Sequence, residues 1–470
     1  MNFSAITFLY YFLPVVVAVY FLCPGRTAKN SLLLFASLFF YAWGEGIFLV
    51  LLLGSIAVNH VIARVIDRRE GRAKRLALTL GIVSNLLFLM IFKYTGLISE
   101  SLAPLGIPKV ETHLPLGISF FTFQAISMIV DVYRGAKPSS SMMKTGLYIS
   151  MFPQLVAGPI VRFNEIRKQI DERSETLDRF AEGVKLFIMG LSQKVLLADT
   201  LAVQADLAFG AVPGELGVAA AWFGLFCFSL QIFYDFAGYS NMAIGLGRLF
   251  GFELPKNFSH PYSASSFQEF WRRWHITLSR WFRDYLYIPL GGSRGGEVKT
   301  YRNLLIVFVL CGLWHGAAWT FLLWGLWHGA FLIAERLCPK LQFSSVIKKP
   351  LGMLYVFLFV SLGWVLFRAD SLAHAFGYWE ALAGLNDSDN TQALPVNRSI
   401  SIAFVMGLFL AWDGSEAMWE AAKKKLSSGP EIAQALLAPA IIWGMPVALY
   451  ALCFIFMASE THKPFLYFRF

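Results

Sequence analysis

Long apolar runs, separated by short basic stretches, constrain this chain more than any other sequence feature. One run begins at Asn303 and holds almost nothing polar until His315, so as a helix it would rise about 18 Å, or half of a bilayer's hydrocarbon core. Hydrophobic residues make up 57% of the 470 positions and charged residues only 15%, which excludes a soluble globular protein. We therefore predict an all-α polytopic membrane protein.

The predicted spans follow from the positions of these runs. The chief ones lie at about 5–23, 31–43, 46–62, 77–96, 114–133, 183–200, 218–250 and 434–457. A further apolar segment at about 145–161 is barely long enough to cross and contains Pro153, Gly158 and Pro159. Because irregular backbone at membrane depth is tolerated only inside protein, we predict that this segment is a re-entrant element that lines a cavity.

No soluble domain separates from the rest, so residues 1–470 are predicted to form one membrane-embedded unit. Its parts are N-terminal helices in 1–100, a core in 113–340 with an interfacial segment at 251–303, and C-terminal helices with a tail in 350–470. The net charge of +10 comes from Lys and Arg in short loops and indicates orientation, not a nucleic-acid partner. The positive-inside rule places both termini outside the cytoplasm, and the scattered cysteines predict neither a metal site nor a disulfide.

His315 is the first candidate for chemistry, because an ionisable side chain deep in a membrane usually faces a cavity and not lipid. It lies beside Trp314 in Gly312-Leu313-Trp314-His315-Gly316, whose glycines allow helices to approach closely. The motif recurs at Gly325-Leu326-Trp327-His328-Gly329, where we interpret His328 as a packing residue or a neighbour of the site. A purely structural, hydrogen-bonded His315 is the alternative.

A second candidate histidine lies in an amphipathic segment. Between Phe267 and Tyr285, aromatic residues recur at helical spacing and arginines lie away from that stripe, which predicts an interfacial helix. His275 lies at the edge of the stripe and could point into a pocket, with Ser279 and Arg273 as neighbouring polar residues. A core histidine satisfied by a backbone carbonyl is the other interpretation.

Polar side chains inside apolar spans form a third group. Asp235, which follows Tyr234, needs a cation, a hydroxyl or a substrate as its partner, and Gln154 lies in the predicted re-entrant element. Hydrogen bonding between helices is an equally good interpretation of these residues. Buried polar groups and broken helices also suit a solute transporter or a polysaccharide-export channel, although no inverted repeat is present.

Five sequence motifs occur in order along the chain. They are Pro115–Phe123 (PLGISFFTF), Pro153–Pro159 (PQLVAGP), Tyr234–Ser240 (YDFAGYS), Glu269–Ser279 (EFWRRWHITLS) and Gly312–Gly316 (GLWHG). With them the chain resembles the membrane-bound O-acyltransferases, and it looks most like the branch that O-acetylates bacterial polysaccharides. The resemblance implies a ring of about 10–12 transmembrane helices, with re-entrant and interfacial helices, around a central funnel or tunnel in the bacterial cytoplasmic (inner) membrane.

The resemblance also implies roles and a reaction. His315 would be the membrane-embedded catalytic histidine and His275 the family's second histidine. An acetyl group would pass from a cytoplasmic thioester such as acetyl-CoA to an extracytoplasmic polysaccharide, first an alginate-like exopolysaccharide, otherwise peptidoglycan or cellulose. Transfer of D-alanyl or another acyl group from a carrier protein is the alternative within the family. No permanently bound cofactor is implied.

The C-terminus supplies a candidate acyl acceptor. Phe465, Tyr467 and Phe470 resemble the terminal motif of the small peptide that accompanies a D-alanylating relative. By that analogy Tyr467 would be acylated inside the tunnel and would pass the group onward, whereas the alternative is an aromatic anchor at the membrane interface. Because the chain has no large extracytoplasmic domain, a partner acyltransferase with a serine hydrolase-like site is also implied outside the cytoplasm.

Overall fold

A computed structural model of the chain describes residues 2–110, 112–338, 349–385, 394–428 and 443–459. Throughout these residues the regular secondary structure is helical. In chain order the α-helices are α1 (Leu13–Leu22), α2 (Gly25–Glu45), α3 (Leu49–Arg68), α4 (Gly71–Leu89), α5 (Thr95–Leu102), α6 (Ile118–Tyr133), α7 (Met142–Ser150), α8 (Phe152–Leu155), α9 (Phe163–Asp171), α10 (Leu177–Ser192), α11 (Asp199–Gly210), α12 (Val218–Leu249), α13 (Phe267–Arg273), α14 (Ile276–Phe282), α15 (Glu297–His315), α16 (Trp319–Leu337), α17 (Lys349–Arg368), α18 (Leu372–Ala383), α19 (Arg398–Ala411), α20 (Asp413–Ser427) and α22 (Met445–Ser459).

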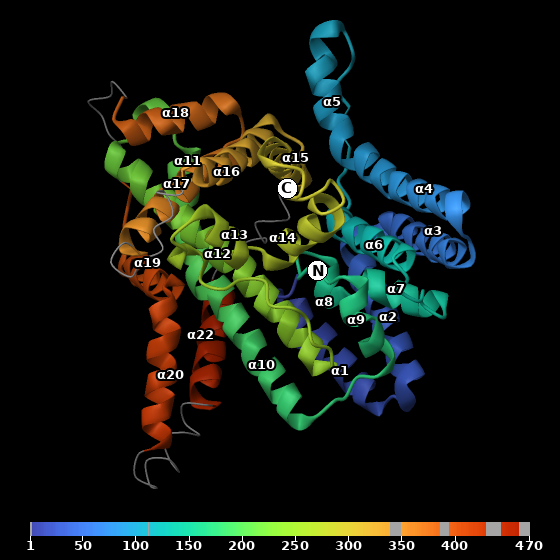
Figure 1. Cartoon of the computed structure of the whole chain (residues 1–470). Helices are drawn as coiled ribbons and strands as arrows, with labels where there is room; N and C mark the ends of the chain where they lie inside the picture. The colour runs from blue at the N-terminus through green and yellow to red at the C-terminus, as the bar shows by residue number, and fades with distance from the viewer. Residues whose placement is uncertain (1, 111, 339–348, 386–393, 429–442, 460–470) are drawn as a thin grey trace.

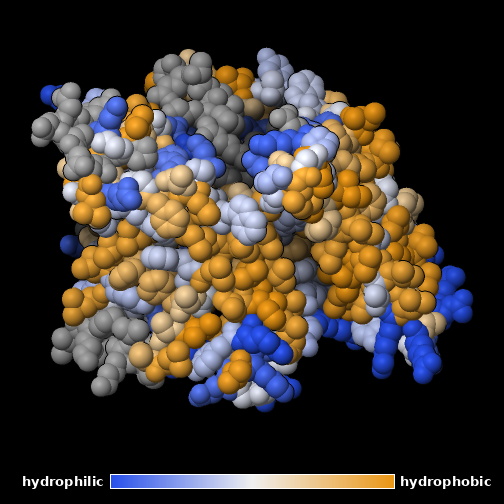
Figure 2. All heavy atoms as spheres, turned by 90° about the horizontal axis from the view of Figure 1, so that it is seen from above, coloured by the Kyte–Doolittle hydropathy of each residue, from blue (hydrophilic) through white to orange (hydrophobic). Residues whose placement is uncertain are grey.

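Among the described residues, five helical segments are long and apolar enough to cross a membrane, and a sixth results if α19 and α20, bent by 82°, count as one crossing. The five are Gly25–Arg68, Gly71–Leu105, Leu177–Gly210, Val218–Leu249 and Lys349–Arg368. Figure 2 shows a broad hydrophobic band with hydrophilic residues on either side of it. The all-α polytopic class is therefore confirmed, whereas the larger number of crossings and the ring around a funnel stay predictions.

Two groups of helices flank the middle of the molecule in Figure 1. α2–α4, α6 and α7 lie on one side, α11 and α16–α19 lie on the other, and α12–α14 lie between them. α12 is the central helix, because most of its 32 residues are buried. Glycines bring α10 against it: a Cβ at Gly190 would meet Gly238 O at 2.4 Å, and a Cβ at Gly238 would meet Gly190 O at 2.6 Å.

The segment predicted to be re-entrant is broken and enclosed by protein. α7 ends before Met151, α8 has only four residues, and every residue from 145 to 161 is buried. Side chains satisfy its irregular backbone, since Phe152 N–H donates to Ser37 Oγ at 3.0 Å and Ile160 N–H donates to Thr277 Oγ1 at 3.0 Å. The prediction of irregular backbone held inside protein is confirmed, and a cavity beside it stays a prediction.

The predicted single helix from Phe267 to Tyr285 is wrong. The structure has two helices there, α13 and α14, because His275 between them has φ 40° and ψ 54°, outside the range of a right-handed helix. The amphipathic pattern itself is confirmed: the aromatic stripe is largely buried, and Arg272 and Arg280 are exposed. The break carries no signal in that pattern; Asn257, which lies outside the pattern, accepts hydrogen bonds from the N–H groups of Ile276 and Thr277 just after it.

A cluster around Glu175, outside the predicted spans, fastens the start of α2 to the loop before α10. Arg26 Nη1 donates to Glu175 Oε1 at 2.5 Å, Tyr20 OH donates to the same oxygen at 2.6 Å, and Lys29 Nζ lies 3.6 Å from it. Burial opposes ionisation of this carboxyl, but the hydrogen bonds from Arg26 and Tyr20 prevail and lower the pKa of Glu175 to about 2.

We predict that Glu175→Gln lowers the free energy of unfolding at neutral pH by roughly 1–3 kcal/mol. A carboxylate with a lowered pKa contributes its full stabilisation above its unfolded value of 4.5 and loses it as the pH falls toward about 2. The difference between wild type and variant, measured by thermal unfolding in detergent, should therefore shrink across that pH range. A difference that does not change with pH would contradict this prediction.

Candidate functional site

His315 is the last residue of α15 and lies inside the protein, with 3% of its surface exposed. The centre of its ring lies 4.9 Å from that of Trp314, 5.0 Å from that of Trp324 and 5.3 Å from that of Phe367. These rings belong to α15, α16 and α17. Three helices that follow one another in the chain therefore place the imidazole in an aromatic enclosure.

The duplicated motif packs α15 against α16 with local two-fold symmetry. A Cβ at Gly312 would lie 2.2 Å from Phe321 O, and a Cβ at Gly325 would lie 2.2 Å from Phe308 O. Phe308 and Phe321 are as far apart in the sequence as Gly312 and Gly325, so each copy of the motif makes the same contact with the other helix. The glycines thus allow the close approach that the sequence indicates.

His328 has the position in its copy of the motif that His315 has in the other copy, but its surroundings differ. It lies within its helix, is fully buried, and neither of its ring nitrogens has a hydrogen-bond partner among the described residues. Trp324 lies 4.8 Å from the His328 ring and 5.0 Å from the His315 ring. Trp324 thus contacts both histidines. His328 lies next to the site but inside a helix, whereas His315 lies at a helix end.

Two residues that sequence reasoning missed hold the end of α15. Lys93 Nζ donates to the carbonyl oxygens of Trp314 and His315, the latter at 3.0 Å, and Tyr94 OH donates to Leu313 O at 2.7 Å. Lys93 is buried. A signal was present in the sequence, because a single lysine inside an apolar span is costly and so marks a functional position by default.

His275 is fully buried at the break between α13 and α14. Asn257 Oδ1 accepts hydrogen bonds from Thr277 N–H at 3.2 Å, from Thr277 Oγ1 at 2.9 Å and from His275 Nδ1 at 3.1 Å. Because a backbone N–H can only donate, the amide atom that faces it is the oxygen, and His275 Nδ1 therefore carries the proton. Nε2 keeps its lone pair and has no hydrogen-bond partner among the described residues. Asn257 was missed because it precedes the histidine motif and belongs to no pattern.

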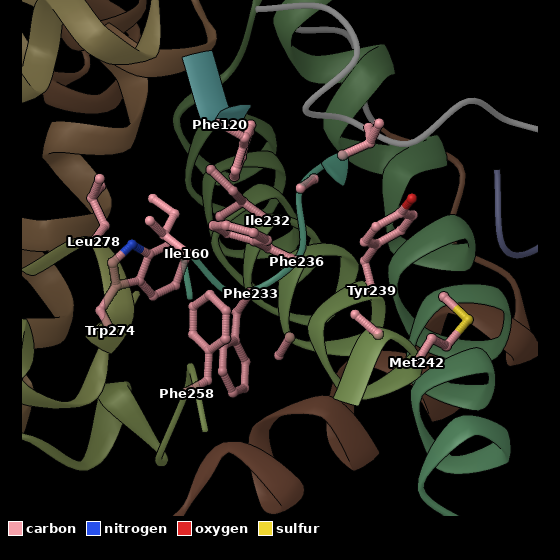
Figure 3. Packing of buried hydrophobic residues seen from close by; sticks show 14 of the residues in the cluster. Phe120, Ile160, Ile232, Phe233, Phe236, Tyr239, Met242, Phe258, Trp274 and Leu278 are labelled. Carbon is pink, nitrogen blue, oxygen red and sulfur yellow. The ribbon is translucent and has the colours of Figure 1, made fainter. Parts of the chain in front are cut away.

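Trp314 joins the two candidate histidines. Its ring lies 4.9 Å from that of His315 and 6.0 Å from that of His275, and its Nε1–H donates to Ser119 O at 3.3 Å. Behind His275, Phe236 of α12 lies 4.7 Å away, on the helix face that Figure 3 shows turned toward Phe258 and Trp274. The structure therefore brings together the two histidines and the tryptophan that the sequence singles out.

The polar residues of the spans contact other helices. Asp235 Oδ1 lies 2.8 Å from Lys194 Nζ, which also lies 2.5 Å from Asp199 Oδ1. Tyr234 OH donates to a carbonyl of α19 at 2.6 Å, and Gln154 Nε2 donates to a carbonyl of α7. These contacts favour the interpretation of Asp235, Tyr234 and Gln154 as links between helices.

The remaining predicted residues lie near His275 in the chain or outside the described part of it. Arg273 Nη2 lies 2.5 Å from Glu269 Oε1, and its Nη1 lies 3.5 Å from Asp413 Oδ2, so carboxylates engage this guanidinium. Ser279 N–H donates to His275 O at 3.1 Å, as an ordinary helical bond. Tyr467 and the rest of the C-terminal motif lie outside the described residues.

The fold and the site together define a polytopic helical membrane protein with a buried centre in which two histidines contact the same tryptophan. Neutral imidazoles accept and donate protons near neutral pH, so such a centre suits acid–base chemistry away from bulk water. The family model of MBOAT, the membrane-bound O-acyltransferase family, matches residues 39–367. The chain belongs to this family, which confirms the resemblance seen in its motifs.

Similar proteins cover most or all of the chain. The "Probable alginate O-acetylase AlgI" of Azotobacter vinelandii is 39% identical over 503 aligned residues, with 100% of both chains covered. The protein of the same name from Pseudomonas aeruginosa is 43% identical over 392 residues, which cover 81% of this chain and 75% of the relative. The "Peptidoglycan O-acetyltransferase" of Helicobacter pylori is 40% identical over 423 residues, covering 82% and 80%. Membership of an acyltransferase family favours an enzyme over a transporter or an export channel.

We expect Gly312→Ala to weaken the contact between α15 and α16, because the new Cβ would lie 2.2 Å from a main-chain oxygen. The free energy of unfolding should fall by about 1–3 kcal/mol, which thermal unfolding in detergent measures. Gly54→Ala in α3 is the matched control, since a Cβ there meets nothing within 4 Å, and alanine favours a helix. Equal melting temperatures for the two variants would rule out the contact as a source of stability.

Proposed function

We propose that this chain is a membrane-bound O-acetyltransferase that passes an acetyl group from a cytoplasmic thioester, such as acetyl-CoA, toward an extracytoplasmic polysaccharide. An alginate-like exopolysaccharide is the proposed acceptor, because the relatives that align over the whole chain are named alginate O-acetylases. The likeness to the Helicobacter pylori protein supports peptidoglycan as the second choice. The observation that carries the chemistry is the pair of buried imidazoles, His315 and His275, beside Trp314.

In this proposal His315 is the general base. It accepts the proton of the attacking hydroxyl, whose oxygen bonds to the thioester carbonyl carbon. The C–S bond then breaks, and the departing thiolate takes up that proton as a thiol. Aromatic rings around His315 support this step, because they exclude the water that would otherwise hydrolyse the thioester.

His275 has a supporting role: its unprotonated Nε2 accepts a hydrogen bond from the acyl donor and so orients it. Asn257 fixes the ring so that Nδ1 is protonated and Nε2 is the acceptor. The backbone of His275 has φ 40°, a conformation that a residue other than glycine keeps only where its surroundings enforce it. Such local strain is typical of functional sites, which supports the assignment.

Replacing His315 by Ala should slow acetyl-CoA turnover by about 10²–10⁴-fold, the usual contribution of a general base. Purified wild type and variant in detergent would be compared by release of the free thiol, with thermal unfolding as the check on folding. Undiminished turnover by a folded variant would end the proposed role. Turnover of a D-alanyl carrier thioester, with none of acetyl-CoA, would instead favour the alternative acyl group.

The C-terminal motif adds an acyl relay to the proposal. The hydroxyl oxygen of Tyr467 takes the acetyl group from the thioester and releases the thiol, and an acceptor hydroxyl then displaces the tyrosine oxygen, which recovers its proton. An aryl ester suits this role, because a phenol of pKa ~10 leaves more readily than an alkanol. The support is the likeness of Phe465, Tyr467 and Phe470 to an acyl-accepting peptide.

Tyr467→Phe should abolish polysaccharide acetylation, because the relay oxygen is gone. Mass spectrometry of the C-terminal peptide should find an acetyl group on Tyr467 in wild type and none in His315→Ala. Arg469→Lys, which keeps the tyrosine and the charge, is the control and should acetylate normally. Full polymer acetylation by Tyr467→Phe would leave the aromatic anchor as the better interpretation.

The proposal places the chain in the bacterial cytoplasmic membrane with both termini outside the cytoplasm, which the basic loops support. It includes an extracytoplasmic partner acyltransferase with a serine hydrolase-like site that completes transfer to the polymer. Arg272 and Arg280 are exposed on α13 and α14, and in the proposed orientation they face the cytoplasm. Their charge suits the phosphates of coenzyme A and equally an acidic carrier protein.

A further inference from the structure

The C-terminal end of α15 contacts residues that lie outside the five sequence motifs. A helix leaves its last carbonyl groups without partners in the helix, and no water satisfies such groups at membrane depth. In α15 these are the carbonyls beside and at His315. Whatever satisfies them also fixes the backbone that carries the imidazole.

Lys93 is bonded to this helix end through its whole ammonium group. Its Nζ donates to Trp314 O, to His315 O at 3.0 Å and to Ser119 Oγ at 3.3 Å. An ammonium has three donors, so all three are used. Tyr94 adds a fourth bond, from its hydroxyl to Leu313 O at 2.7 Å. Three consecutive carbonyls of α15 are thus held by two adjacent residues.

Lys93 and Tyr94 are adjacent in the chain and reach the same helix end from a local change of helix type. On an α-helix, neighbouring side chains point about 100° apart. Lys93 and Tyr94 lie instead in the π-helix η3 (Met90–Tyr94), between α4 and α5. Single π-turns of this kind are rare and are frequently found at functional sites.

The charge of Lys93 has the helix end as its counterpart. Among the described residues no carboxylate lies within ion-pair distance of Lys93, in contrast to Lys194, which has Asp199 and Asp235. The C-terminus of a helix carries partial negative charge, which a nearby cation stabilises. A buried lysine whose only role was to link helices could contact any part of a neighbouring helix. Lys93 instead contacts the end of α15 that carries His315.

We propose that Lys93 and Tyr94 are positioning residues for His315, a proposal that rests on the function proposed above. Their polar groups hold the last turn of α15, and so set where the imidazole stands relative to the thioester and the attacking hydroxyl. The consequence is kinetic: loss of either group displaces the base without removing the donor's binding contacts.

The test compares Lys93→Met, Lys93→Arg and Tyr94→Phe with wild type in full-length protein in detergent, using acetyl-CoA turnover. A shift of the base by about 1 Å costs on the order of 10²-fold in rate, so kcat of Lys93→Met should fall about 10–100-fold, with KM for acetyl-CoA within about twofold. Lys93→Arg, which keeps charge and donors, should recover much of the loss. Tyr94→Phe, which removes one oxygen, should show a smaller fall in kcat.

Asn85→Leu is the matched control, because Asn85 is a buried polar residue of the same continuous helical segment, Gly71–Leu105, and exchanges hydrogen bonds with Asn59 at 2.7 and 3.1 Å. It should lower the melting temperature and leave kcat per folded molecule unchanged. A folded Lys93→Met with wild-type kcat, or a loss that appears in KM alone, would overturn the positioning role. So would an equal loss of kcat in Asn85→Leu.

Hydrogen exchange gives a readout that needs no activity. Lys93→Met and Tyr94→Phe should speed amide exchange at residues 311–316, whereas Asn85→Leu should not. Unchanged exchange there in both variants would sink the inference, even if a variant lost stability elsewhere. If His315→Ala retained turnover, the proposed function would fail; if it lost turnover while Lys93→Met did not, this inference alone would fail.

Discussion

A helix that ends or breaks inside a membrane protein leaves main-chain groups that only other protein groups can satisfy. In this structure side chains from distant helices satisfy them. α15 ends at His315 and is met by Lys93 and Tyr94. The break between α7 and α8 is satisfied by Ser37 of α2, and the irregular backbone after α8 is satisfied by Thr277 of α14. The irregular points of the backbone are therefore the ones most closely tied to the rest of the fold, and the candidate site is built between them.

Charge inside the protein follows the same logic in two forms. Lys194 is paired with the carboxylates of Asp199 and Asp235, and these ion pairs join α12 to the π-helix η5 (Gln193–Ala198) and to the start of α11. Lys93 is placed against dipoles instead, with carbonyls and a hydroxyl around it. The first arrangement cross-links helices wherever it stands. The second arrangement stabilises a cation only at the C-terminal end of a helix, where carbonyl groups lack helical partners. Its location next to the imidazole therefore points to a role in holding His315.

The sequence predicts those features that local pattern determines. Apolar runs predict the helical membrane class, the prolines near 153 predict the enclosed break, and the glycine motif predicts the close approach of α15 and α16. The pattern failed at His275, because the hydrogen bonds at this break go to Asn257, which lies outside the aromatic stripe. It failed at Lys93 for another reason: the residue was visible, but its target lies more than two hundred positions away in the chain.

The contact at the heart of the duplicated motif has an evolutionary consequence. On each side, the hydrogen of a glycine faces a main-chain oxygen of the opposite helix. When two side chains collide, a second substitution elsewhere can shrink the obstacle and restore the fit. Here the obstacle is the peptide unit itself, which no codon change can make smaller. Loss of either glycine can be accommodated only if the two helices move apart, so we expect both glycines to persist wherever the helices stay this close.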